Sequence, residues 1–311
     1  MFIPGWAFEL ATEIQSYRIN GSTLADVVNP GQRPAPRQGR GTEWFGKREY
    51  VSGDPLNIID WCSIARHAYL ENPPIFVKTF DVELANVTTV VVDCSASMDV
   101  WPGEGKLSTA IGVSELLAWA AINHGDPVEI LFVGDTIDRT GLINNPVEFI
   151  REIKTIEALP FSASGEMSWN TLMDTRQGLE GSRHTIVLIG DFFESEDEIA
   201  KALSGLGQIV RTVLAVRIFS SSDEDPFISG QDLELYDVEN TSQRKSVNAD
   251  LGKYRQRLEY HRNAVADILM EEGVRFADIK AIPLNYSRDR GKGIPYPQDI
   301  LNKLVEAELL V

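Results

Sequence analysis

Three short apolar runs, each followed by an aspartate, constrain this chain more than any other feature of its sequence. The runs are VTTVVV before Asp93, VEILFV before Asp135 and TIVLI before Asp191, with a glycine inserted ahead of the last two aspartates. Runs rich in β-branched residues are typical of strands that are buried on both faces of a parallel sheet. The sequence therefore predicts an α/β fold in which three strands end next to carboxylates.

Segments with helical spacing of apolar residues alternate with these strands. We expect helices at 107–122 (with one buried face), 148–156, 172–179, 196–206, 251–270 and 299–310, and further strands at 209–218 and 274–282. Strands that alternate with helices form βαβ units, and their strands form a parallel sheet. We therefore predict a Rossmann-like domain with a mostly parallel central sheet flanked by helices, in which ligands bind at the carboxyl ends of the strands.

The charge pattern suggests how the chain is organised. We expect an N-terminal segment, 1–84, to pack as an extension on a domain that spans 85–311 and carries an acidic insertion around 219–250. Residues 29–48 hold five basic side chains against one acidic one, among prolines and glycines, whereas 191–240 hold twelve acidic against three basic ones. The basic stretch is either solvated surface or an arm that docks on an acidic partner or on this chain's own acidic side.

Composition excludes several classes of function. The chain has 29 basic and 46 acidic residues, a net charge of −17, which disfavours binding to nucleic acid or to anionic lipid. Its apolar stretches fall short of the roughly 20 residues that a membrane-spanning helix needs, and its start lacks the pattern of a signal peptide. The two cysteines, Cys62 and Cys94, suit a reducing compartment, so we expect a cytoplasmic protein without membrane insertion.

The sequence Asp93-Cys-Ser95-Ala-Ser97 could hold a metal ion. Alternate side chains of an extended segment point the same way, so these three oxygen-bearing side chains can converge on one point. Hard oxygen donors suit Mg²⁺ or Mn²⁺ better than zinc, and Asp191 from another strand could approach the same point. Spacing alone leaves an alternative open, in which these residues cap the following helix.

The D-x-S-x-S string after an apolar strand resembles the metal-ion-dependent adhesion site (MIDAS) of von Willebrand factor type A (vWA) domains. The segment before it resembles the hallmark of the bacterial family called domain of unknown function fifty-eight, in which a vWA domain follows. The matching stretches are Gly39-Arg-Gly-Thr-Glu-Trp-Phe45, Arg48-Glu-Tyr50, Gly53-Asp54, Ile59-Asp60-Trp61 and Ala65-Arg66. We interpret the charges among these aromatic residues as paired charges that brace the segment rather than as a docking face.

The resemblance implies a site and a partner. It makes Asp93, Ser95, Ser97, Ser168 and Asp191 the metal ligands, with Mg²⁺ or Mn²⁺ as the ion. Met167 stands where vWA domains carry a threonine, so Ser168 is the nearest hydroxyl and Thr171 the next; a thioether does not hold Mg²⁺. Family members are associated with MoxR-type AAA+ ATPases, which implies a non-catalytic adaptor for the assembly or maturation of other complexes.

Two alternatives from other classes remain. Asp93, Asp135 and Asp191 could form the carboxylate cluster of a metal-dependent hydrolase, or the chain could be a scaffold whose metal site has decayed. A phosphate-binding loop at Gly103-Glu-Gly-Lys106 is excluded because Val100 and Leu107 occupy the positions that need a glycine and a hydroxyl. Cys94 lies between the predicted ligands but should face the core, so we expect no nucleophilic thiol there.

Overall fold

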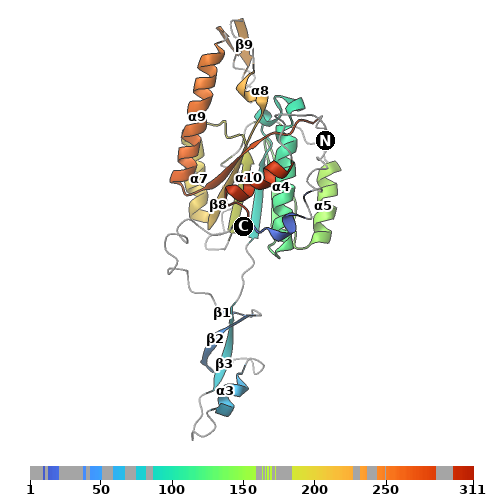
Figure 1. The fold of residues 1–311 in the computed structure, drawn as a ribbon, viewed down its shortest axis with the longest axis vertical. Coiled ribbons are helices and arrows are strands. Elements are labelled where there is room, and N and C mark those ends of the chain that lie inside the picture. The colour runs from blue at the N-terminus through green and yellow to red at the C-terminus, as the bar shows by residue number, and fades with distance from the viewer. Residues whose placement is uncertain are drawn as a thin grey trace. The chain divides into compact units, whose positions relative to one another are not determined.

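The computed structural model of the chain divides by contacts into two units (Figure 1). The larger consists of Met1–Leu24 and Ala85–Val311, and the smaller of Ala25–Leu84, so the start of the predicted segment 1–84 belongs to the larger unit. The residues that the structure describes are 10, 13–20, 38–39, 43–50, 59–66, 75–81, 87–158, 163, 165, 167, 169, 172, 184–226, 232–236, 244–248, 250–284 and 297–311.

Within the described residues, the larger unit is built on a six-stranded sheet with the order β11-β8-β7-β4-β5-β6. Its strands are β4 (Val87–Asp93), β5 (Val128–Val133), β6 (Ile137–Arg139), β7 (His184–Gly190), β8 (Thr212–Phe219) and β11 (Arg275–Lys280). β6 pairs antiparallel with β5, and the other pairings of this sheet are parallel. The predicted Rossmann-like α/β fold with a mostly parallel sheet is confirmed.

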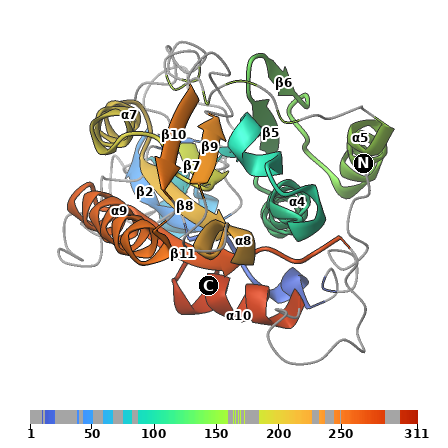
Figure 2. The same ribbon diagram turned by 90° about the horizontal axis from the view of Figure 1, so that it is seen from above.

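Helices cover both faces of the sheet (Figure 2). One face packs against α4 (Lys106–Asn123), α5 (Pro146–Ala158), α10 (Pro297–Glu306) and the 3₁₀ turn η1 (Ile14–Ser16), and the other against α7 (Glu196–Ile209) and α9 (Leu251–Glu271). Side chains along β7 are apolar on both faces, because each face contributes to a separate core. Val187 and Ile189 lie in the core beneath α4, and Ile186 and Leu188 lie in the core beneath α7 and α9. None of the described helices is both long and apolar enough to cross a membrane.

Helix α4 is more deeply buried than the sequence predicts. The sequence predicts one buried face, but the first turn and most of the circumference of α4 are enclosed, and even Lys106 and Glu115 are about as buried as its apolar residues. The reason is tertiary: α4 lies between the sheet, α5 and η1, so little of its surface remains for solvent. A polar residue in this helix therefore needs a partner within the protein.

Some predicted boundaries and elements differ from the structure. The strand expected at 209–218 begins only at Thr212, because α7 continues to Ile209, and the helix expected to reach residue 310 ends at Glu306. The acidic insertion holds a short helix, α8 (Ser221–Glu224), and an antiparallel hairpin of β9 (Asp232–Tyr236) and β10 (Arg244–Asn248). The helix expected at 172–179 lies outside the described residues except for Leu172.

The described N-terminal residues of the larger unit pair with its last residues. Arg18 and Val311 exchange two backbone hydrogen bonds of 2.8 Å, and Ile19 forms an antiparallel bridge with Leu310. The side-chain amide of Asn20 donates to the carbonyl oxygen of Glu308 at 3.0 Å, across 288 residues of chain. The two ends of the larger unit are thus part of one structure.

The smaller unit contains a three-stranded antiparallel sheet with the order β1-β3-β2. Its elements are β1 (Gln38–Gly39), β2 (Glu43–Glu49), α3 (Trp61–Arg66) and β3 (Phe76–Asp81). Lys47 Nζ lies 2.6 Å from Asp60 Oδ2, and Asp60 is only 5% exposed, which supports the interpretation of this hallmark charge as a brace. The side chains of Glu43 and Arg48, and Asp54 as a whole, lie outside the described part, and Arg66 is exposed.

Candidate functional site

The loop after β4 brings three of the predicted ligands together. Asp93 is the last residue of β4 and is only 4% exposed. Its Oδ1 accepts a hydrogen bond of 2.8 Å from the backbone N–H of Ser95, and the Oγ atoms of Ser95 and Ser97 lie 2.9 Å apart. One carboxylate and two hydroxyl groups therefore converge at the carboxyl end of a central strand, which is where ligands of open α/β sheets bind.

The same geometry speaks against helix capping by the serines. Ser95 precedes the 3₁₀ turn η3 (Ala96–Asp99), yet its side chain makes no capping hydrogen bond there. Helix α4 starts after Gly105, a residue without a side chain that could cap it. The N–H group of Ser95 donates to the Asp93 carboxylate rather than to a serine side chain, and the Ser95 and Ser97 hydroxyl groups bond to each other.

Asp191 follows the neighbouring strand β7, and it is held by a buried lysine. Lys106 Nζ, on the first residue of α4, donates a hydrogen bond of 2.7 Å to Asp191 Oδ2 and lies 3.4 Å from Oδ1 of Asp223 in α8. The three side chains are 3%, 2% and 5% exposed. Because attraction between charges is strong where water is excluded, this cluster fixes three elements to one another.

The chain around Asp191 is shaped to keep that contact. Phe192 has a φ of 54°, a left-handed conformation that costs a residue with a Cβ about 1–2 kcal/mol, and its ring is buried in the core beneath α7 and α9. This turn leaves Phe193 close to the lysine, with Lys106 Nζ 5.1 Å from the centre of its ring. Such strain at a strand end is typical of functional sites.

Gly190 lets Asp93 lie against β7. A Cβ on Gly190 would come within 2.9 Å of both the Cβ and the Oδ2 of Asp93. Since β4 and β7 are paired in register from Val87 and His184 onward, neither strand can move aside at this point. The absence of a side chain at position 190 is thus what allows Asp93 and Asp191 to occupy adjoining strand ends.

The third strand-end aspartate does not join the other two. Asp135 is exposed, and its carboxylate lies against Gly165, whose φ is 68° and whose added Cβ would come within 1.6 Å of Asp135 Oδ1. Gly165 in turn accepts a hydrogen bond of 3.0 Å from Ala96 N. In the described part of the chain, no three His, Cys, Asp or Glu side chains are grouped so that they could hold a metal ion.

The loop that should supply the remaining ligand presents a thioether and an indole. Met167 is only 8% exposed, and Trp169 packs with it against the core; Ser168 and Thr171 lie outside the described residues. Between this loop and the ends of β4 and β7 lies a small hollow of ≈220 Å³, part of which is open to solvent. Asp93 and Glu194 are its acidic lining residues, and the others include Val91, Met167, Trp169, Gly190 and Phe192.

Cys94 points away from the site, as predicted. Its side chain is in the core beneath α4, and burial, together with the neighbouring charges of Asp93 and Asp138, raises the pKa of the thiol far above its ordinary value. A thiol that stays protonated is neither a metal ligand nor a nucleophile.

The donor set fits a hard divalent cation in part. Asp93, Ser95 and Ser97 supply the oxygen atoms that Mg²⁺ or Mn²⁺ prefers. Asp191 is close by on the neighbouring strand, but one of its oxygens is taken by the Lys106 ammonium. Three protein oxygens leave half of an octahedral shell for water or for a partner, and Mg²⁺ in proteins usually keeps several waters.

Reasoning from the sequence missed Lys106 and Asp223. In the sequence, Lys106 stands out only as part of an incomplete phosphate-binding loop, and Asp223 only as one acidic residue of the insertion. One signal was present: a lysine as the first residue of a helix is opposed by the helix dipole, which favours anions at that end. A cation at this position therefore calls for a specific carboxylate partner.

No curated protein is significantly similar in sequence to this chain. Among solved structures, the protein BatB from Bacteroides thetaiotaomicron is similar with a TM-score of 0.38 and 13% identity, over 71% of this chain and 98% of that one. The SpRpn10 VWA domain is similar with a TM-score of 0.39 and 11% identity, over 70% of this chain and 95% of that one. An aerotolerance-related membrane protein from Bacteroides fragilis NCTC 9343, carrying multiple mutations to serines, is similar with a TM-score of 0.36 and 13% identity, over 72% of this chain and 98% of that one.

A family model described as "Protein of unknown function DUF58" matches residues 46–267, which include the site and the hallmark stretches from Arg48 onward, but not the stretch 39–45. The match spans most of the chain, and the resemblance that the hallmark residues carried is confirmed. This chain belongs to the DUF58 family.

Proposed function

We propose that this chain is a non-catalytic protein-interaction module, an adaptor that binds a MoxR-type AAA+ ATPase through a divalent cation at the end of β4. The observation that carries the proposal is the convergence of Asp93, Ser95 and Ser97 at the carboxyl end of a central strand. Membership of the DUF58 family and its resemblance to vWA domains support the partner class. Since such a partner consumes ATP, the site would act in the cytoplasm.

The residues of the site would have separate roles. Asp93, Ser95 and Ser97 would hold Mg²⁺ or Mn²⁺, and the family resemblance adds Ser168 as a further ligand. When bound, the ion would accept a carboxylate oxygen from an aspartate or glutamate of the partner. Asp93 and Asp191 are both buried, and the chain carries a net charge of −17, so an acidic partner would be repelled without a cation.

The test is affinity capture of the ATPase by wild type and by Asp93→Ala, each in Mg²⁺ and in excess EDTA, with mass spectrometry of the bound proteins. Asp267→Ala is a matched control, because Asp267 is an exposed aspartate on α9. We expect a MoxR-type ATPase with wild type and Asp267→Ala in Mg²⁺ only. If Asp93→Ala, or wild type in EDTA, captured as much of the ATPase as wild type in Mg²⁺, the chain would instead be a scaffold whose metal site has decayed.

The metal-dependent hydrolase has no comparable support. It needs the three strand-end carboxylates in one cluster, and Asp135 is turned to Gly165 instead. Turnover of phosphoester substrates by wild type in Mg²⁺ or Mn²⁺, lost in Asp93→Ala, would nevertheless replace the adaptor proposal.

A further inference from the structure

A buried ammonium group is bound to Asp191, one of the residues that the family resemblance assigns to the metal site. Lys106 Nζ is 2.7 Å from Asp191 Oδ2, so Asp191, which the family resemblance assigns to the metal, already has a positively charged partner. The lysine side chain is 3% exposed, which means that the contact is made without competing water. An ion pair of this kind is retained only if its partners stay together, because a buried charge left alone is costly.

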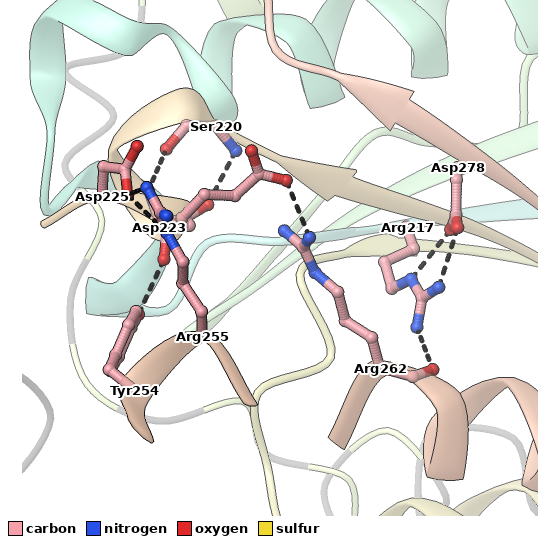
Figure 3. Close-up of polar contacts among 9 residues, drawn as sticks. Arg217, Ser220, Asp223, Asp225, Tyr254, Arg255, Arg262 and Asp278 are labelled. Carbon is pink, nitrogen blue, oxygen red and sulfur yellow. Dashed lines mark hydrogen bonds and ion pairs between the residues drawn. The ribbon is translucent and has the colours of Figure 1, made fainter. Parts of the chain in front are cut away.

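The position of the ammonium is fixed from a second side. Asp223 lies in α8, at the end of the neighbouring strand β8, and its Oδ1 is 3.4 Å from Lys106 Nζ. Its Oδ2 accepts a hydrogen bond of 2.7 Å from Ser220 N, and its backbone oxygen accepts one of 2.7 Å from the Tyr254 hydroxyl on α9 (Figure 3).

Two further ion pairs join α9 to the last residue of α8 and to the residue after it, as Figure 3 also shows. Arg262 on α9 reaches Glu224 at 2.9 Å, and Arg255 pairs with Asp225. The carboxylate that holds Lys106 from the side of α8 is therefore anchored to another helix. The position of Lys106 is therefore fixed by Asp223 as well as by Asp191.

The charge of Lys106 and its hydrogen bond both limit how well Asp191 can act as a metal ligand. One oxygen of its carboxylate accepts a hydrogen bond from the ammonium, and a divalent cation that approached Asp191 would meet the positive charge of Lys106. We infer that Lys106 is an internal competitor of the divalent cation, a positioning residue that withholds Asp191 and thereby keeps the metal affinity of the site low. This inference rests on the proposed function, since it concerns regulation of the same site.

The competitor sets a condition for tight metal binding. Asp191 becomes a ligand only when the ammonium leaves it, and the cluster of one ammonium and two carboxylates then loses its internal cation. The divalent ion would replace that charge. Tight metal binding, with Asp191 as a ligand, and the Lys106–Asp191 contact are thus alternatives.

The decisive experiment measures Mn²⁺ affinity by electron paramagnetic resonance in a double-mutant cycle. The Lys106→Met/Asp223→Asn variant removes the ammonium and one carboxylate together, so the charge of the cluster is the same as in wild type. Asp191→Asn is then introduced into both backgrounds. We expect it to weaken Mn²⁺ binding at least about tenfold more in the variant background than in wild type, because only there is Asp191 a ligand.

A second measurement covers the case in which the double variant is poorly folded. Lys106→Gln leaves two buried carboxylates without a cation, so we expect its melting temperature to fall in EDTA and to be restored by Mg²⁺, whereas that of wild type responds much less.

The outcomes are distinguishable. Equal effects of Asp191→Asn in the two backgrounds, or no rescue of Lys106→Gln by Mg²⁺, would overturn this inference and leave the proposed function standing. Absence of Mn²⁺ binding in every variant, wild type included, would overturn both.

Discussion

Gly190→Ala is the substitution that tests the geometry of the site most directly. The added Cβ would lie 2.9 Å from the Cβ of Asp93, whereas carbon atoms in favourable contact are about 3.5–4.0 Å apart. The two side chains would therefore have to separate by about 0.6–1.1 Å. β7 is paired on both sides, with β4 and with β8, so the strand cannot retreat and Asp93 must move instead.

The expected cost follows from this overlap. Forcing an extra carbon atom into a packed interior destabilises proteins by about 1–3 kcal/mol, and we expect Gly190→Ala to lower the free energy of unfolding by that amount. Urea denaturation followed by circular dichroism measures it. We also expect weaker Mn²⁺ binding than in wild type, because the displaced carboxylate is the one that anchors the metal ligands.

Gly207→Ala is the matched control. Gly207 is exposed in α7, and a Cβ there meets no atom within 4 Å. The same change should stabilise the protein by up to about 1 kcal/mol, since alanine favours helix. Because both substitutions remove a glycine from the unfolded chain, the difference between them reports the native contact. If Gly190→Ala were as stable as wild type and bound Mn²⁺ equally well, our account of the strand ends would be refuted.

Three further predictions concern other parts of the chain. Iodoacetamide should label the exposed Cys62 at neutral pH and leave Cys94 unmodified in the native protein, because burial raises the pKa of the Cys94 thiol; equal labelling in a mass spectrum would contradict this. Hydrogen bonding from Lys47 lowers the pKa of Asp60 below its ordinary value of 3.8, so the pair stabilises the fold above that pH and ceases to do so as the pH falls through the lowered pKa. A carbon-13 NMR titration of Lys47→Met should find the Asp60 pKa raised relative to wild type. Leu117→Ala, in the buried middle of α4, should cost about 2–5 kcal/mol in urea denaturation, and a loss below 1 kcal/mol would mean that α4 is not central to the core.

Much of the sheet could be predicted because its signal is local. Apolar runs such as 128–133 identify a buried strand by themselves, and β5 has those bounds. The missed strands lack that signal: β6 is a three-residue edge strand with partly exposed side chains, and β9 and β10 pair with each other in a polar insertion. Short edge strands are specified by their pairing partners rather than by their own apolar pattern.

The sequence predicted the loop of the site and the strand-end position of Asp191, but not the lysine that joins Asp191 to Asp223. Asp93, Ser95 and Ser97 lie on one loop, and their convergence follows from the alternation of side chains. The lysine contacts join residues that are 85 and 117 positions apart, Lys106 with Asp191 and with Asp223. No periodicity or motif relates these positions, so the contact becomes visible only when the sheet brings the ends of β7 and β8 beside the start of α4.

The pairing of residues 18–20 with residues 308–311 bears on the order in which the protein folds during synthesis. The smaller unit, 25–84, is inserted into the larger one, and all its residues leave the ribosome before most of the larger unit exists. At about 5–20 residues per second, the N-terminal partner of Glu308 waits some tens of seconds for the last strand and helix to appear. The smaller unit can therefore become structured first, while the beginning of the larger unit remains an unpaired segment that a chaperone could bind until translation reaches α10 and the residues that follow it.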